Sequence, residues 1–142
     1  MKLIATIVGC LLFVVLFAAC EQKVEKQETK AVVAPAKPMA MMMRAIYQQS
    51  AEMREWVEAG KPLDSTHFRF LDFHQLEPTD STVLVEVFYK HNQDFKAAFE
   101  DLIQAGEADK EKYNTLLTKC VSCHEDFCPG PIKRINKLKL AS

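Results

Sequence analysis

Apolar residues recur at helical spacing through most of the chain after residue 38. The clearest stretch runs from about Ser81 to Ala105 and follows the i, i+3, i+4, i+7 pattern of a helix with one buried face. The positions on that face are Leu84, Val87, Phe88, His91, Phe95, Ala98, Phe99 and Leu102. We expect Asp80 or Ser81 to cap its start and Gly106 to end it. The short run 82–85 also fits a strand, but the chain offers no partner strand.

The same periodicity predicts three further helices. One runs from about Met39 to Ala59 and ends at Gly60, and one from about Asp64 to Leu76, where Phe70 and Phe73 fall off the apolar face. The last runs from about Asp109 to Cys128 and is stopped by the sequence Pro129-Gly130-Pro131. Four helices joined by short loops predict an all-α domain folded as an antiparallel four-helix bundle.

The N-terminal residues show a different pattern, which is typical of protein export. Lys2 precedes an apolar run from Leu3 to Phe17, and small residues follow. The sequence Phe17-Ala18-Ala19-Cys20 resembles the lipobox of bacterial lipoproteins. We therefore expect a lipoprotein signal peptide over residues 1–19 and lipid attachment at Cys20. A conventional cleaved signal that ends at a cysteine is the alternative.

Residues 20–38 are predicted to form a flexible linker after the lipidated cysteine. They are rich in charge, poor in large apolar side chains and end in two prolines, a composition that does not bury enough surface to fold. The folded domain is therefore predicted to span residues 39–142. Export and a lipid anchor together place it on the periplasmic face of a bacterial membrane. The formal net charge of −1 gives no indication of nucleic-acid binding.

The candidate chemistry lies on the last predicted helix, where Cys120, Cys123 and His124 form a C-x-x-C-H motif. Two cysteines three residues apart lie on one helix turn and can reach the two vinyl groups on one edge of a haem. The histidine that follows can bind the iron as its proximal axial ligand. Tyr113 and Phe127 recur at the same helical spacing and are predicted to line the haem pocket. The motif thus predicts one covalently attached haem c.

Two other interpretations of these cysteines compete with haem attachment. Cys120, Cys123, His124 and Cys128 are residue types that could form a zinc site, but adjacent Cys123 and His124 are poorly placed to occupy two corners of one tetrahedron while helical. A redox dithiol normally begins a helix after a strand, whereas this motif lies near a helix end. We find no Ser-His-Asp set, phosphate-binding glycine loop or paired carboxylates, so an enzyme is not predicted.

With the motif on the last helix of a bundle, residues 39–127 resemble the cytochrome c′ group of four-helix-bundle cytochromes, here as a small bacterial haem lipoprotein. The matching residues are Cys120-Val121-Ser122-Cys123-His124-Glu125-Asp126-Phe127, together with Arg44 near the start of the first helix. The resemblance implies a haem near one end of the bundle with Arg44 at its pocket. Two positions depart from the group: Cys128 stands where Arg or Lys is common, and Gln48, near the distal position, is not a usual iron ligand.

The sixth iron ligand decides between functional classes. Met43 is our first choice, because the start of the first helix is expected at the level of the haem, and His74 is the alternative. His91, about ten residues into its helix, is expected to be too deep and to be a core histidine that is hydrogen-bonded across the bundle. A sixth ligand favours an electron carrier that exchanges electrons with redox partner proteins of the cell envelope. An open position favours a gas-binding (NO or CO) protein, and a peroxidase-like enzyme ranks last. Homodimer formation is left open.

The basic C-terminal tail is the last feature of the sequence. Lys133, Arg134, Lys137 and Lys139 are expected to form a solvated end with a weak apolar stripe of Ile135 and Leu138. As a functional alternative, such a tail could steer acidic partners towards the domain.

Overall fold

The computed structural model describes residues 36–78, 80 and 85–141. The predicted signal peptide over 1–19, the lipidation site at Cys20 and nearly all of the linker lie outside the described residues. The chain divides into two units, Met1–Ala34 and Pro35–Ser142, and every described element belongs to the second. Within the described residues the fold is all-helical and contains no strand, as predicted. Its helices are α2 (Pro38–Glu58), α3 (Glu86–Gln104), α4 (Lys110–Phe127) and α5 (Ile132–Asn136).

Helix α2 confirms the first predicted helix almost to the residue. Pro38 occupies its first turn, where proline's fixed φ suits a helix and its missing N–H costs nothing. The helix ends before Gly60, which adopts a φ of +68°, a conformation that glycine accepts without a steric penalty. The buried face comprises Met39, Ile46, Ser50, Met53 and Val57.

The predicted helix over 64–76 is wrong, because this segment forms turns and extended chain. The Asp64 side chain accepts hydrogen bonds from the backbone N–H groups of Thr66 and His67, which favours a turn over a helix. The buried apolar residues of this region, Leu63, Phe68 and Phe73, are each five positions apart. Five-residue spacing cannot place side chains on one face of a helix, so an irregular path is what lets all three reach the core.

Helix α3 begins later than the sequence predicts. Val85, in an extended conformation with φ −122° and ψ 165°, precedes the first helical residue, Glu86. Asp80 therefore does not cap the helix, and Ser81 lies outside the described residues. The β-branched residues of the run 82–85 have low helix propensity, which explains why the helix starts beyond them. Its buried face is Phe88, Asn92, Phe95, Phe99 and Leu102.

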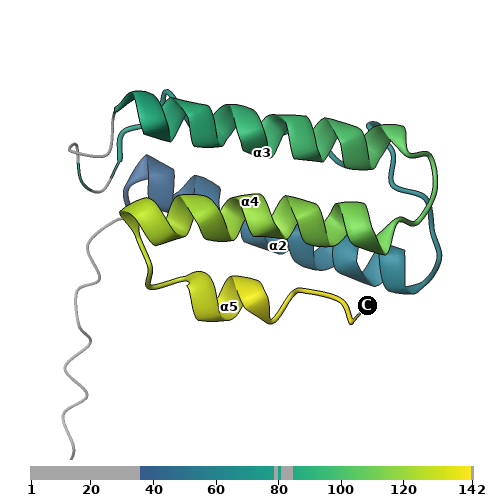
Figure 1. The fold of residues 1–142 in the computed structure, drawn as a ribbon. Helices are drawn as coiled ribbons and strands as arrows, with labels where there is room; N and C mark the ends of the chain where they lie inside the picture. The colour runs from purple at the N-terminus through teal and green to yellow at the C-terminus, as the bar shows by residue number, and fades with distance from the viewer. Residues whose placement is uncertain (1–35, 79, 81–84, 142) are drawn as a thin grey trace, which may run out of the picture. The chain divides into compact units, whose positions relative to one another are not determined.

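Helix α4 contacts each of the other helices and so forms the centre of the domain. Figure 1 shows α3 and α4 running alongside each other, joined by the short loop 105–109, with α5 beside α4. Asp109 caps α4 by accepting a hydrogen bond from the Lys112 N–H at 2.9 Å. The extended segment 61–78 runs from the end of α2 back towards the end of the domain where α3 begins. The domain therefore has three long helices, and this segment takes the place of the second helix of the predicted four-helix bundle.

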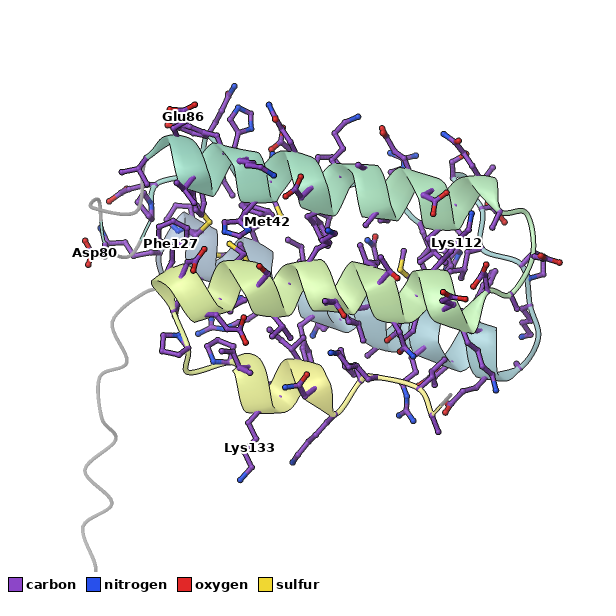
Figure 2. The ribbon with its side chains drawn as sticks, in the orientation of Figure 1. Met42, Asp80, Glu86, Lys112, Phe127 and Lys133 are labelled. Atoms are coloured by element: carbon purple, nitrogen blue, oxygen red, sulfur yellow. The ribbon has the colours of Figure 1, made fainter. Side chains whose placement is uncertain are left out.

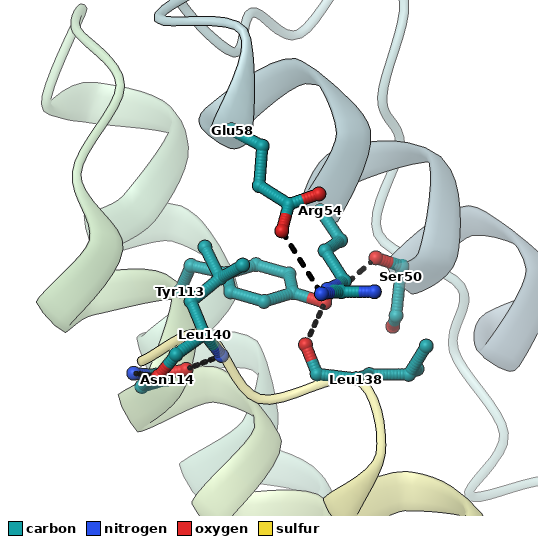
Figure 3. A network of polar contacts seen from close by, with 7 residues as sticks. All are labelled: Ser50, Arg54, Glu58, Tyr113, Asn114, Leu138 and Leu140. Atoms are coloured by element: carbon teal, nitrogen blue, oxygen red, sulfur yellow. Dashed lines mark hydrogen bonds and ion pairs between the residues drawn. The ribbon is translucent and has the colours of Figure 1, made fainter. Parts of the chain in front are cut away.

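The C-terminal tail is a structured part of the domain, which corrects the prediction of a solvated end. Ile135, Leu138 and Leu140 are buried. The single proton of the Tyr113 hydroxyl on α4 is shared between the carbonyls of Ser50 at 2.9 Å and Leu138 at 3.3 Å, so one side chain links α2, α4 and the tail (Figure 3). Asn114 bonds both the N–H and the carbonyl of Leu140, each at 2.9 Å.

No helix in the described part of the chain has both the length and the apolar composition needed to cross a membrane.

Candidate functional site

Cys120, Cys123 and His124 lie on the last two turns of α4, as predicted. Both cysteines are free thiols, partly buried and packed against the hydrophobic core. Leu116, Leu117 and Val121 are buried on the same helix, and their contacts with the core fix how α4 is rotated about its axis. That rotation places the two thiols at the margin of the core, one helix turn apart.

Burial disfavours the thiolate form of both cysteines in the folded domain. Loss of hydration raises the pKa of Cys120 to about 12, and burial together with the nearby Asp126 and Cys128 raises that of Cys123 to about 11. Reactive redox cysteines have the opposite property, a lowered pKa that supplies thiolate at neutral pH. The pKa values of both thiols therefore disfavour the dithiol redox interpretation.

The His124 imidazole is held by the backbone at the end of its own helix. Its Nδ1 lies 2.9 Å from the carbonyl oxygen of Cys128, and the Cys128 N–H donates in turn to the His124 carbonyl at 3.0 Å. A carbonyl oxygen can only accept a hydrogen bond, so Nδ1 carries the proton and Nε2 of the neutral ring bears the lone pair. Cys128 thus orients the histidine through its backbone, a contact that the sequence analysis missed. Pro129, which ends the helix there, was the available signal.

Aromatic side chains surround the end of α4 that carries the motif. The Phe127 ring lies edge-on to Phe88, with centroids 5.7 Å apart, and to His91 at 6.0 Å. Phe73 from the extended segment packs against Phe88 at 5.6 Å. Segments far apart in the sequence thus build one apolar cluster beside Cys123 and His124, and Phe127 lies where a pocket residue was predicted.

The four methionines at the start of α2 lie at the same end of the domain. Figure 2 shows Met42 and Phe127 at this end, with Lys112 of α4 at the other. Met39 is buried, Met42 and Met43 are partly buried against the core, and Met41 is 59% exposed. Met41 therefore lies on the exposed face of α2 and the other three methionines face the core, as the helical pattern implies. The assignment of Met43 as the sixth iron ligand stays a prediction.

The other candidate ligands, His74 and His91, occupy two different places. His74 bonds Asp72 through Nδ1 at 2.6 Å and contacts the Tyr89 ring at 6.0 Å, in a cleft whose lining includes Asn92 but neither cysteine of the motif. His91 instead pairs through Nε2 with Asp126 of α4 at 2.7 Å. This contact confirms the predicted hydrogen bond from His91 to another helix. The depth predicted for His91 is wrong, because α3 begins at Glu86. His91 is therefore five residues into the helix, roughly 7.5 Å along its axis.

Two further residues predicted for the pocket lie in other surroundings. Arg44 is exposed on α2. Tyr113 is fully buried and lies seven residues before Cys120, roughly 10 Å along α4. Its hydroxyl contacts Ser50 and Leu138 (Figure 3), so its observed role is to join three parts of the fold.

Metal-binding residues are not gathered anywhere in the described ranges: no three His, Cys, Asp or Glu side chains there are grouped so as to hold a metal ion. We therefore do not propose a zinc site built from the three cysteines and His124. Comparison with protein families, with curated proteins and with solved structures finds no match to this chain, so the function is argued from the residues of the site.

Proposed function

We propose that this domain carries one haem c, attached through Cys120 and Cys123 with His124 as its proximal ligand, and that it transfers electrons in the bacterial cell envelope. The observation that carries the proposal is the hydrogen bond from His124 Nδ1–H to the Cys128 carbonyl. It leaves the Nε2 lone pair for iron and fixes the ring beside two thiols on the same helix. This is how iron-binding histidines are commonly oriented in proteins.

The donor set suits a haem better than a bare metal ion. A porphyrin supplies four nitrogens of its own, so one protein nitrogen is enough to hold the iron from one side. Cys120 and Cys123, one turn apart on α4, are spaced for two thioether bonds to one haem edge. When bound, a haem supplies a one-electron iron couple whose potential depends on axial ligands and burial.

Each surrounding group has a role that follows from its position. The backbone of Cys128 orients His124, and the pair formed by His91 and Asp126 ties α3 to the last turn of α4. The cluster of Phe73, Phe88 and Phe127 gives this end of the domain an apolar lining. We propose Met43 as the sixth ligand. An iron with protein ligands at both axial positions suits electron transfer, because no position is open to a gas or substrate.

The cytochrome c′ resemblance and the membrane anchor belong to the same proposal. The order of the elements, with the cysteine pair at the end of the last long helix, supports membership of that group. The signal pattern ahead of Cys20 supports a lipid-tethered protein on the periplasmic side, and a tethered carrier is suited to exchange electrons between partners at a membrane.

Optical spectra of protein produced with a c-type haem assembly system test the proposal. We expect a low-spin spectrum in both oxidation states and slow carbon monoxide binding, because a ligand already fills the sixth position. The matched control is Cys128→Ala, which removes the third thiol of this region but keeps the motif and should leave the spectra unchanged. A high-spin protein that binds carbon monoxide rapidly would replace the electron carrier with a gas-binding protein.

A further inference from the structure

Positive charge is concentrated in the C-terminal segment 129–141. This segment contains Lys133, Arg134, Lys137 and Lys139, four of the chain's 18 lysines and arginines, and none of its 19 aspartates and glutamates. Because the net charge of the whole chain is −1, the remainder of the molecule is acidic. We call these four side chains the α5 patch. The chain therefore has a basic face on an otherwise acidic body.

The side chains of the α5 patch form no ion pair, whereas five of the ten other lysines and arginines among the described residues do. Lys90, Lys96 and Lys112 each form an ion pair with a nearby carboxylate, and so do Lys37 and Arg54. None of the ion pairs found among the described residues involves a member of the α5 patch. Its charge is thus not neutralised by neighbouring carboxylates and remains available to an outside partner.

The segment that carries the α5 patch is packed against the rest of the domain. Ile135, Leu138 and Leu140 are buried beneath it, and the carbonyl of Leu138 accepts the Tyr113 hydroxyl. The Arg134 guanidinium lies 4.8 Å from the centre of the Tyr47 ring, a cation–π contact with α2. Lys133 points away from α4 (Figure 2). A partner would therefore meet a segment whose backbone is already held in place, and binding would order less of the chain than binding to a flexible tail.

The position of the patch links it to the candidate site. Helix α5 begins four residues after Cys128 and packs on α4, the helix that carries Cys120, Cys123 and His124. A molecule bound at α5 would lie beside the end of α4 where we propose the haem.

An acidic protein surface fits the patch better than a lipid surface. Helices that lie in a membrane present apolar side chains to the lipid as well as basic ones. Here the apolar residues of the segment are turned inward, and the large exposed apolar residues in the described ranges are Met41, Val85, Val87 and Tyr89, none of them on α5.

We propose that the α5 patch is the docking surface for an acidic face of a protein partner. The choice of an electron-transfer partner rests on the proposed function, whereas the charge pattern and its rigid support do not. Basic and acidic faces attract over distances comparable to the Debye length, so the contact should speed encounter and weaken as salt rises.

The test measures binding to dye-labelled poly-L-glutamate by fluorescence anisotropy, at about 20 mM and at about 300 mM salt. All proteins in it carry Cys20→Ser, so that a lipid on Cys20 cannot itself bind vesicles. The variant is Lys133→Glu/Lys137→Glu, two exposed positions of the patch. The control is Arg69→Glu/Lys110→Glu, which changes the net charge equally at exposed positions outside the patch. We expect the patch variant to bind about tenfold more weakly than wild type at low salt and the control less than threefold, with all binding weakened at high salt.

Three results would overturn the proposal. Equal losses in both variants would mean that only net charge matters, and absence of binding at low salt would mean that the patch does not recognise acidic chains. Tighter binding to vesicles of phosphatidylglycerol and phosphatidylcholine than to poly-L-glutamate would assign the patch to a membrane. Circular dichroism of both variants confirms that they fold. Because no readout here involves iron, a failure of the haem proposal leaves this test intact.

Discussion

Replacing Tyr113 by phenylalanine should destabilise the domain by an amount that depends on pH. The side chain is fully buried on α4, and its hydroxyl bonds to both α2 and the C-terminal tail. Phenylalanine keeps the ring and its packing but removes the donor. The loss of a buried hydrogen bond of this kind costs about 1–2 kcal/mol of unfolding free energy at neutral pH.

The pH dependence has a definite sign. Burial raises the pKa of Tyr113 above its usual value, so the folded state keeps the proton at pH values where the unfolded chain releases it. The contribution of Tyr113 to stability is therefore complete below the unfolded pKa of about 10 and falls by about 1.4 kcal/mol per pH unit above it. Phenylalanine does not titrate. The stability difference between wild type and Tyr113→Phe should consequently shrink to near zero at about pH 11.

Urea unfolding followed by far-UV circular dichroism at pH 7 and pH 11 measures both effects. Tyr47→Phe is the control: this residue is only partly buried, and its ring contact with Arg134 survives the change. We expect it to cost less than about 0.5 kcal/mol at either pH. A Tyr113→Phe variant as stable as wild type at pH 7, or a stability difference that does not narrow at pH 11, would refute this account of how the tail is held.

Three other changes probe the helix cap, the iron and the anchor. Asp109→Ala removes the side-chain cap of α4 and should lower the free energy of unfolding by about 1 kcal/mol in urea titrations; an unchanged midpoint would show that the cap adds nothing. Met43→Ala should shift the ferric spectrum towards high spin and lower the reduction potential, because thioether ligation favours ferrous iron. The exposed neighbour in Met41→Ala should change neither, and equal responses would refute the ligand assignment. Cys20→Ser should move the protein from the membrane to the soluble fraction, and wild type found already in the soluble fraction would contradict lipidation.

Local signals in the sequence predicted the long helices well. The start of α2 follows from Pro38, its end from Gly60, and the end of α4 from Pro129, each through a backbone constraint that acts on its own few residues. The same constraints placed Cys120 and Cys123 on one side of a helix end. These features need no knowledge of the tertiary fold.

The errors lie where distant contacts decide the structure. Phe68 and Phe73 leave helical geometry because the core between α2 and α3 accepts them from an extended chain, which periodicity alone does not reveal. Because α3 starts later than predicted, His91 lies nearer to the start of the helix than expected. It is therefore at the level of the motif, where it bonds to Asp126. The tail is short, but Tyr113 and Asn114 supply the hydrogen bonds that fix it, and a sequence does not show which distant residues will pair.

The intact mass of the mature protein under denaturing conditions tests the central proposal most directly. Protein matured with a c-type haem assembly system should weigh one haem more than its polypeptide and any lipid, since thioether bonds to Cys120 and Cys123 survive unfolding. Cys128→Ala should keep that added mass, and Cys120→Ala/Cys123→Ala should lose it. A wild-type protein without the added mass of a haem would contradict haem attachment at this site.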